Sequence, residues 1–348
     1  MLVTAVCGIG VGSQIVKALR LSKHGYYIVG LDSEVLSIGF NNVDKFYNVP
    51  SAASQDYIDI LLNICKAESI KVIFCGSEIE LKRISPERNR FIEMGIFFPY
   101  NNQRILDLCF NKSDTIKWLE YNNFLFPRSI VVYSPEELEA VYDFPVVLKP
   151  HINSGGSTNV FIAQDKKELY FIGNYLLSIC NEFMIQQYIG STHEEYTVGI
   201  LFDMEGSLIN SIVIKKNIFF YLSNRLKVKN KTNKKELGDT LAISSGISQG
   251  EINNFPVIAQ QCEIITKKMN CVSAVNIQCR VVNDDVYVFE INPRFSGTTS
   301  LRAIVGYNEP DILIQKHFFN YKPKKYFKYN KGIILRGIYE DYIPFKNV

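Results

Sequence analysis

The sequence lacks an excess of charge of either sign. Its 38 lysine and arginine residues nearly balance 35 aspartate and glutamate residues, which leaves a formal net charge of +3. Such a balance does not indicate a nucleic-acid partner. The chain also lacks any apolar run of about 18 residues, so we expect no membrane-spanning helix. With 348 residues, 47% of them hydrophobic, it can bury a core that is divided between two or three lobes.

Cysteine pairs and clustered histidines are also missing. The eight cysteines occur singly, mostly in apolar stretches, and none belongs to a CxxC pair. This pattern favours buried thiols in a reducing compartment over a disulfide framework. The four histidines are too scattered to predict a zinc site. Because the first residues, MLVTAVCGIGVGSQIV, lack the basic segment of a signal peptide, we expect a cytoplasmic protein.

Short apolar runs alternate with amphipathic stretches in the first hundred residues. This alternation predicts an α/β fold with a doubly wound parallel sheet in this region. Helices are expected over 107–123 and 254–269, the second with Asn254 as its N-cap. The expected strands lie at 2–7, 26–32, 72–75, 96–98, 144–150, 184–190, 196–203, 207–214, 274–282 and 286–292.

The last two expected strands form a hairpin around the turn at 283–285. If all three turn residues form the loop, Gln278 lies opposite Glu290 and Asn276 lies opposite Asn292. Side chains alternate between the two faces of a strand, so these four even-numbered polar residues share one face. A two-residue turn would break this convergence. The other, apolar face is expected to carry Val275, Ile277, Val281, Tyr287, Phe289 and Ile291.

Polar groups gathered on one strand face need partners, because an unpaired buried carboxylate or amide costs about 1–3 kcal/mol. One interpretation is a sheet face in contact with solvent. The other is a site for a hard cation, since Mg²⁺ or Mn²⁺ takes oxygen ligands and uses one or two carboxylates together with substrate phosphates. Gln278, Glu290 and Asn292 supply such oxygens, and we predict them as the metal ligands.

The same residues carry a family resemblance. The segments Asn276-Ile-Gln278 and Glu290-Ile-Asn-Pro-Arg294 resemble the metal-binding end of ATP-grasp enzymes, in particular the carbamoyl-phosphate-synthase-like branch of the carboxylate–amine ligases. The resemblance implies a doubly wound N-terminal sheet followed by an α+β ATP-grasp fold with a small lid subdomain. The boundaries that it implies are an N-terminal domain at 1–106, a linking helix at 107–126, a lid subdomain at 127–187, a catalytic subdomain at 188–330 and an extension at 331–348.

Upstream segments suit the phosphates of a nucleotide. Lys149 ends an expected strand, where its charge can reach a phosphate, although a surface lysine is the plain alternative. The segment at 154–158 (SGGST) offers backbone N–H groups in a turn that glycine lets approach a ligand closely. The resemblance implies that Lys112, Lys149 and Gln278 belong to the ATP site and that the β- and γ-phosphates are covered by Ser154, Gly155, Gly156 and Ser157.

The resemblance also implies the remaining nucleotide contacts. Backbone groups of Gln187, Tyr188 and Ile189 would read the adenine edge, and Glu195 would lie near the ribose or the lid phosphates. Gln186 stands at a hinge position where relatives commonly carry glutamate. An amide there can still bond a ribose hydroxyl, but it lacks the charge.

Together these residues predict an ATP-dependent ligase that joins a carboxylate to an amine or ammonia through an acyl phosphate and releases ADP and phosphate. Glu290, Lys149 and Arg294 are the predicted catalytic residues. Arg294 is included because its planar guanidinium matches the geometry of phosphate. We find no Ser-His-Asp or Cys-His constellation, and this chemistry needs none. The expected partners are small-molecule carboxylates and amines, without nucleic acid or membrane, and a homodimer stays open.

The glycine-rich start offers a competing function. The segment at 8–12 (GIGVG) follows an expected strand and Asp32 ends the next one, which is close to a dinucleotide-binding fingerprint. That pattern would make the protein an NAD(P)-dependent oxidoreductase, but Ser13 occupies the position of the third glycine. We therefore favour a role for this turn in facing the substrate. A non-catalytic protein that senses ATP is the third alternative.

Two charged segments have open roles. Glu78 and Glu80 follow a strand of the first lobe, where they either contact an amine or start a helix in solvent. The tract from Lys215 to Lys235 contains basic residues and no acid. A solvated loop is the favoured interpretation of this tract, followed by a basic flap over an anionic substrate and then by nucleic-acid or membrane contact.

Overall fold

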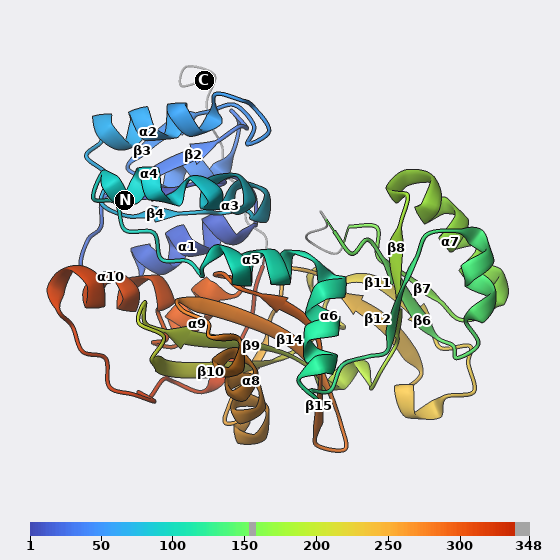
Figure 1. Ribbon diagram of the computed structural model, residues 1–348. Helices are drawn as coiled ribbons and strands as arrows, with labels where there is room; N and C mark the ends of the chain where they lie inside the picture. The colour runs from blue at the N-terminus through green and yellow to red at the C-terminus, as the bar shows by residue number, and fades with distance from the viewer. Residues whose placement is uncertain (153–157, 338–348) are drawn as a thin grey trace. The chain divides into compact units, whose positions relative to one another are not determined.

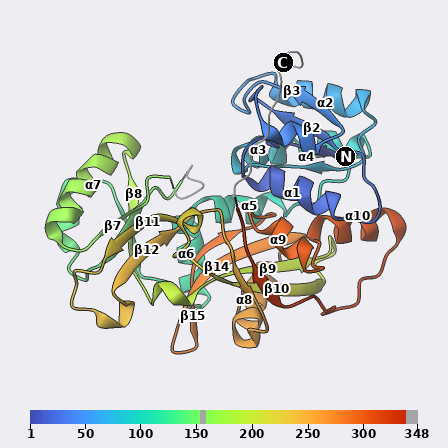
Figure 2. The ribbon, with the colours of Figure 1, turned by 180° about the vertical axis from the view of Figure 1, so that it is seen from behind.

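The structure is a computed structural model that describes residues 1–152 and 158–337 (Figures 1 and 2). Contacts between residues divide the chain into two compact units. The first unit contains residues 1–99 and 295–323 with the segment from 334, and the second contains residues 100–294 and 324–333. The finer subdivision expected from the sequence stays a prediction.

The first unit is an α/β unit built on a parallel sheet. Its strands are β1 (Leu2–Val3), β2 (Val29–Asp32), β3 (Lys45–Asn48) and β4 (Ile73–Phe74), in the order β3-β2-β1-β4. Its helices are α1 (Val11–Arg20), α2 (Tyr57–Ala67), α3 (Glu78–Ile84), α4 (Arg88–Glu93), α9 (Thr299–Ile304) and α10 (Glu309–Phe319), with short 3-10 helices at Ile38–Asn42 and Ser85–Glu87. Helices α1 and α2 lie on opposite faces of the sheet (Figures 1 and 2), which confirms the expected doubly wound arrangement.

The turn between β1 and α1 explains the glycines at the start of the sequence. Gly8 has a φ of +76°, a conformation that glycine adopts without strain. A side chain at Gly12 would bring its Cβ within 2.2 Å of the backbone oxygen of Ala5. Glycine is therefore required at this position so that the first turn of α1 can pack directly against the backbone that follows β1.

The second unit contains a six-stranded, a four-stranded and a two-stranded sheet among its described residues. The six-stranded sheet has the order β15 (Asp285–Asn292), β14 (Ala274–Val282), β9 (Glu195–Phe202), β10 (Leu208–Lys216), β13 (Gly250–Ile252) and β16 (Gly332–Ile334). The four-stranded sheet has the order β5 (Ser129–Val132), β8 (Phe183–Gln187), β6 (Val146–Lys149) and β7 (Phe161–Ala163). The two-stranded sheet pairs β11 (Asn224–Lys229) with β12 (Thr240–Ser244).

The second unit also contains four α-helices among its described residues. They are α5 (Gln103–Phe110), α6 (Lys112–Tyr121), α7 (Lys166–Cys180) and α8 (Pro256–Met269). Short 3-10 helices lie at Pro135–Ala140, Thr192–Glu194, Tyr221–Ser223 and Lys235–Leu237. Helix α7 packs on one face of the four-stranded sheet and encloses a separate small core there (Figure 1).

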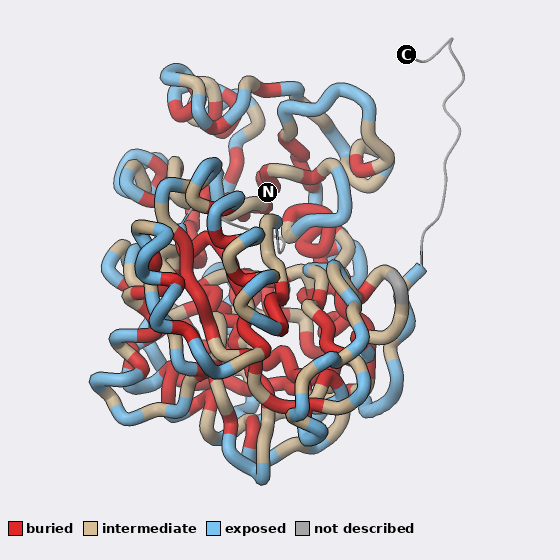
Figure 3. Tube along the Cα trace, turned by 90° about the vertical axis from the view of Figure 1, so that its right-hand side faces the viewer, coloured by how far each residue is buried: buried red, intermediate tan, exposed pale blue. Residues whose placement is uncertain are grey.

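One face of the six-stranded sheet forms the main hydrophobic core of the second unit. Helices α5, α6 and α8 contribute to this core, and Val198, Ile200 and Ile277 of the central strands are completely buried in it. Buried residues run along the interior strands and exposed residues lie mostly in loops and on the outer helices (Figure 3). Because neighbouring side chains on a strand point to opposite faces, the other face of the same strands is left to carry polar groups.

Two helix boundaries differ from those expected. The helix predicted over 107–123 is two helices, because Asn111 leaves the helical conformation with φ −103° and ψ 109°. Its side chain accepts hydrogen bonds from the backbone N–H groups that begin α6, so an asparagine cap starts a new helix there. The prediction of Asn254 as an N-cap is wrong, since α8 begins at Pro256 and its N-cap is Phe255.

The cysteines follow the expectation from their apolar surroundings. All eight are free, and six of them are buried. Within the described ranges, no helix combines the length and the apolar character that crossing a bilayer requires.

Candidate functional site

The polar face of the six-stranded sheet carries aligned rows of side chains. One row consists of Lys216 on β10, Glu195 on β9 and Arg280 on β14. The next row, two residues away along β14, pairs Gln278 with Glu290 of β15. Because residues two apart on a strand share a face, both rows lie opposite the hydrophobic core.

The hairpin of β14 and β15 closes with a different turn from the one expected. Its turn contains two residues, Asn283 and Asp284, both with positive φ, a conformation that asparagine and aspartate tolerate. This shorter turn shifts the register by one residue, and a bulge beside Gln278 shifts it back. The predicted three-residue loop is therefore wrong, as is the statement that a two-residue turn would break the convergence. The predicted pairing of Gln278 with Glu290 is confirmed.

The bulge also exchanges the faces of β15 along its length. Val286 and Val288 lie in the hydrophobic core, where Tyr287 and Phe289 were expected. Beyond the bulge, Ile291 lies in the core as predicted. The extra residue belongs to β15, so the side chains of β14 follow the expected alternation throughout.

Glu290 lies among cations and an amide. Nε2 of Gln278 donates a hydrogen bond to Oε2 of Glu290, and Nζ of Lys112 lies 3.9 Å from Oε1. Burial raises the pKa of the Glu290 carboxyl, but the positive charges of Lys112 and Lys149 more than offset this and hold the pKa below its usual range. Glu290 is consequently an anion at neutral pH, which is the form that binds metal ions.

Asn292 and Arg294 are joined at the end of β15. Oδ1 of Asn292 accepts a hydrogen bond of 2.9 Å from Nη2 of Arg294. The backbone N–H of Arg294 also donates to the backbone oxygen of Asn292 at 2.8 Å. This tight turn across Pro293 holds the guanidinium close enough to Glu290 for its charge to lower the pKa of that carboxyl.

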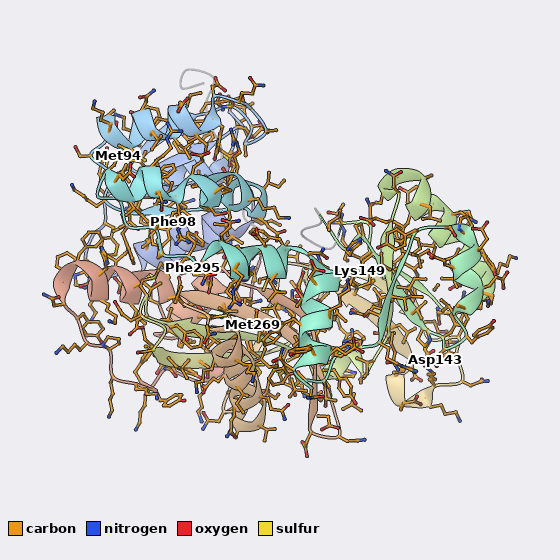
Figure 4. The ribbon with its side chains drawn as sticks, in the orientation of Figure 1. Met94, Phe98, Asp143, Lys149, Met269 and Phe295 are labelled. Carbon is orange, nitrogen blue, oxygen red and sulfur yellow. The ribbon has the colours of Figure 1, made fainter. Side chains whose placement is uncertain are left out.

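Lys149 is a buried lysine at the end of β6, close to the start of α6 (Figure 4). Its Nζ donates a 2.8 Å hydrogen bond to Oε1 of Gln186 on the neighbouring strand, and Gln186 donates in turn to Oγ of Ser129. Burial and the nearby charge of Lys112 lower the pKa of Lys149 to about 8. The alternative of a surface lysine is wrong, because only 7% of Lys149 is exposed.

Glu195 belongs to a buried ion cluster that the sequence did not reveal. Its Oε1 accepts from Nζ of Lys216 at 3.1 Å, and its Oε2 accepts from Nε of Arg280 at 3.0 Å. Burial raises the pKa of this carboxyl, but Lys216 and Arg280 more than offset this and hold the pKa at about 2. The contact of Glu195 with ribose or lid phosphates stays a prediction.

The interpretation of the basic tract as a solvated loop is wrong at its start. Lys216 is only 5% exposed, and it is the last residue of β10. The signal in the sequence was its place at the end of the apolar strand LINSIVIKK, in alternation with Ile214. Further along the tract, β11 presents Arg225, Lys227 and Lys229 to solvent, between half-buried residues of a small core.

The hinge after β8 is ordered by contacts with β12 and β14. The hydroxyl of Tyr188 bonds both backbone groups of Ala242, and the guanidinium of Arg280 lies 4.4 Å from the centre of the Tyr188 ring. Arg280 also donates to the backbone oxygen of Ile189 at 3.2 Å. The reading of an adenine edge by Gln187, Tyr188 and Ile189 stays a prediction.

Lys112 is positioned by the chain that follows β6. Its backbone N–H donates to the backbone oxygen of His151 at 3.0 Å, and Nδ1 of His151 lies 3.3 Å from Oδ1 of Asn111. These contacts tie the start of α6 to the segment that leads into the predicted glycine loop. The loop residues Ser154, Gly155, Gly156 and Ser157 lie outside the described residues.

The polar groups of the first unit are engaged within that unit. Asp32 accepts hydrogen bonds from the backbone N–H groups of Cys7 at 2.8 Å and Glu34 at 3.1 Å. Its carboxylate therefore points to the backbone of the segments that follow β1 and β2. Glu78 pairs with a lysine of its own helix at 3.0 Å. Glu80 is buried, and it accepts from the hydroxyl groups of Thr4, Tyr57 and Ser77.

The donor set of the second unit fits a hard divalent cation bound together with phosphates. Glu290 supplies a carboxylate, and Gln278 and Asn292 carry amide oxygens beside it. Within residues 1–152 and 158–337, no three or more His, Cys, Asp or Glu side chains come together in a way that could hold a metal ion. The site therefore relies on amide oxygens and on the oxygens of an incoming nucleotide, as Mg²⁺ sites commonly do. The cations Lys112, Lys149 and Arg294 can neutralise charge on a transferred phosphoryl group.

Two family models match the chain. The first, described as a PylC-like N-terminal domain, matches residues 4–98, which form most of the parallel lobe. The second, described as ATP-grasp in the biosynthetic pathway with Ter operon, matches residues 241–338. That second range contains Gln278, Glu290 and Asn292.

Solved structures share the fold at low sequence identity. The biotin carboxylase domain of the 2-oxoglutarate carboxylase of Hydrogenobacter thermophilus, solved as a dimer with MgADP, ADP and bicarbonate, has a TM-score of 0.62 at 14% identity, over 90% of this chain and 68% of that one. L-amino acid ligase from Bacillus licheniformis gives 0.62 at 14% identity, over 90% and 73% of the two chains. D-alanine–D-alanine ligase from Bacillus anthracis gives 0.56 at 18% identity, over 90% and 95%.

Proposed function

We propose that this chain, which belongs to the ATP-grasp superfamily, is a Mg²⁺- and ATP-dependent ligase that joins a carboxylate to an amine or ammonia. The observation that carries the proposal is the meeting of oxygen donors and cations on one sheet face, with Glu290 at its centre. Two of the structures with the same fold are named as amino-acid ligases, and a third holds MgADP, which supports this class of reaction.

Each residue of the site has a defined task in this proposal. Glu290, Asn292 and Gln278 would hold Mg²⁺, which would supply positive charge next to the phosphates of the nucleotide. Lys112 and Lys149 bind the phosphates of ATP. The β- and γ-phosphates are assigned to residues 154–157, which lie outside the described residues, and the adenine and the ribose are assigned to the hinge at 186–189.

The reaction proceeds in two steps. In the first, a carboxylate oxygen of the substrate attacks the γ-phosphorus, the bond from that phosphorus to the ADP oxygen breaks, and an acyl phosphate forms. Arg294 neutralises the charge that develops on the phosphoryl oxygens. In the second, the amine nitrogen attacks the acyl carbon, the bond from that carbon to the phosphate oxygen breaks, and the nitrogen loses a proton. Inorganic phosphate then leaves.

Isotope transfer tests this proposal. Carboxylate and amine pairs are first screened for ADP release that requires both substrates and Mg²⁺. The active carboxylate is then labelled with ¹⁸O, and the released phosphate is analysed by mass spectrometry. One labelled oxygen per phosphate is expected, because the bridging oxygen of an acyl phosphate comes from the carboxylate.

Two results would count against the proposal. Unlabelled phosphate would exclude the acyl-phosphate route while leaving ligation in place. Failure of the protein to bind MgATP, measured by calorimetry, would remove the ligase assignment itself. The homodimer stays a prediction that light scattering on the same preparation can test, and the substrate screen identifies the carboxylate and the amine.

A further inference from the structure

The ammonium group of Lys216 is fixed beside a predicted metal ligand. Its Nζ donates a 2.7 Å hydrogen bond to Oε1 of Gln278, and it also contacts Oε1 of Glu195 at 3.1 Å and Oγ of Ser244 at 3.0 Å. Since Lys216 is 5% exposed and has three hydrogen-bond partners, the fold fixes the position of its ammonium group.

This contact gives the amide of Gln278 a direction. Its oxygen is turned to Lys216, while its nitrogen donates to Oε2 of Glu290. A divalent cation bound by Gln278 would need the same oxygen and would stand next to an ammonium group, where like charges repel. The oxygen of Gln278 is therefore already committed to a cation that belongs to the chain.

Within residues 1–152 and 158–337, the ion pairs of this cluster do not balance in charge. Glu195 is paired with both Lys216 and Arg280, so one negative charge faces two positive charges. The surplus positive charge lies at the Gln278 end of the site. At the other end, Oδ1 of Asn292 also accepts from a cation, Arg294. Arg294 is only half-buried, and the proposed function assigns its guanidinium to the phosphoryl oxygens, so this amide oxygen can turn to a metal ion when nucleotide binds.

We propose that Lys216 takes the place of a second divalent cation, so that the chain binds one metal ion with its nucleotide, on Glu290 and Asn292. This inference rests on the proposed function and changes one part of it, since it removes Gln278 from the metal ligands given there. Phosphoryl-transfer sites often hold two divalent ions that clamp the transferred group from both sides. Here the second positive charge is built into β10, and Gln278 connects it to Glu290 in place of binding metal.

The number of bound metal ions tests this inference without any turnover. Mn²⁺ is titrated into the protein with a non-hydrolysable ATP analogue, by calorimetry and by electron paramagnetic resonance. One Mn²⁺ per chain with an uncoupled six-line spectrum is expected. Two Mn²⁺ with spin coupling would overturn the single-metal inference and leave the ligase proposal standing. Loss of all nucleotide-dependent Mn²⁺ binding would overturn the ligase proposal itself.

Matched variants locate the effect at Lys216. Lys216→Met combined with Gln278→Glu removes the ammonium and adds a carboxylate, so a second Mn²⁺ is expected. Lys215→Met is the control, because it removes the same charge from the preceding residue of β10. Lys215 points away from the site and pairs with Glu194, with 2.5 Å between Nζ and Oε1. This control should bind one Mn²⁺, and a second ion there would overturn the assignment to Lys216.

Gln278→Glu alone covers the case in which the double variant does not fold, as judged by circular dichroism and thermal melting. It keeps the ammonium, which can pair with the new carboxylate, so binding of one Mn²⁺ supports the inference. Binding of two Mn²⁺ by this single variant would show that Lys216 does not exclude the second ion and would overturn it.

Discussion

Glu80 in the first unit is buried and Glu290 in the second is partly buried, and the neighbours of the two carboxylates differ in charge. Glu80 accepts from three hydroxyl groups, and burial raises its pKa. Burial has the same effect at Glu290, but two lysines more than offset it and the pKa is lowered. Hydroxyl partners satisfy the hydrogen-bonding capacity of a carboxylate and serve the fold. Cationic partners keep the carboxylate charged and let it serve a ligand.

Asp32 in the first unit and Lys149 in the second differ in the same way, since only the second is available to a ligand. Asp32 is bonded to backbone N–H groups of its own lobe, and Gly12 packs against the backbone after β1. These contacts give the residues that resemble a dinucleotide fingerprint a role in the packing of the first unit. In the second unit Lys149 is buried, and its hydrogen-bond partner Gln186 is neutral. The positive charge of Lys149 can therefore attract an anion that binds there.

The largest effect is expected for Glu290→Gln. The variant removes the only carboxylate of the proposed metal site among the described residues, so turnover should fall by at least about 10²–10³-fold, the usual cost of losing one charge-stabilising group. Thermal unfolding should change little, because the amide keeps the shape of the side chain. Glu194→Gln is the control and should keep full activity, because Glu194 is a half-exposed acid before β9 that pairs with Lys215. Full activity of Glu290→Gln would break the contrast between the two acids.

A second prediction concerns pH. The pKa of Lys149 is lowered to about 8, so the free protein loses this positive charge as the pH rises through 8. Bound phosphate favours the charged form, so ATP binding takes up a proton above that pH. The affinity should be constant below pH 8 and should fall by up to about tenfold per pH unit above it. Calorimetry in buffers of different ionisation enthalpy measures the proton uptake, and Lys149→Arg should abolish it.

A smaller effect is expected for Gln186→Glu. A carboxylate 2.8 Å from Nζ of Lys149 favours the charged lysine, so the pKa should rise by about one unit or more. The break in ATP affinity should then move to higher pH by the same amount. Gln187→Glu, whose residue follows on the same strand with its side chain on the other face, is the control. An unmoved break in Gln186→Glu would show that this amide does not set the charge of Lys149.

The smallest effect on the nucleotide is expected for Asp32→Asn. The amide cannot accept from both N–H groups as the carboxylate does, so hydrogen exchange in residues 5–12 should accelerate, in line with a local loss of about 1–3 kcal/mol. The affinities for ATP and for NAD should both stay as in the unaltered protein. A selective loss of NAD binding would restore the oxidoreductase alternative and reverse the comparison of the two units.

The sequence allowed three strands of the first unit, β1, β2 and β4, and the polar end of the hairpin to be predicted, because alternation of apolar runs depends on residues close in the chain. It missed β3, and the strand expected at 96–98 is only an isolated bridge at Phe97. The turn and the faces of β15 were wrong because a single extra residue in a strand leaves no mark in the alternation until its partner strand is known. The break at Asn111 was missed because apolar spacing continues across it.

Lys216 was missed for a different reason. Its contacts join three strands: Glu195 is 21 residues from Lys216 in the chain, and Gln278 is 62 residues from it. No local sequence pattern indicates contacts over such separations. In the sequence it stands next to Lys215, whose side chain reaches a half-exposed acid. Two adjacent lysines therefore have opposite fates, because successive residues of a strand face opposite sides of the sheet.

The bulge in the last hairpin has a practical consequence. Asn283 and Asp284 form an exposed tip, and the irregularity beside Gln278 separates the alignment of that tip from the alignment of the oxygen donors. Residues grafted into the tip should lengthen the loop without rotating Glu290. A fluorescent or affinity label placed there would report on the protein from a position that leaves its chemistry untouched.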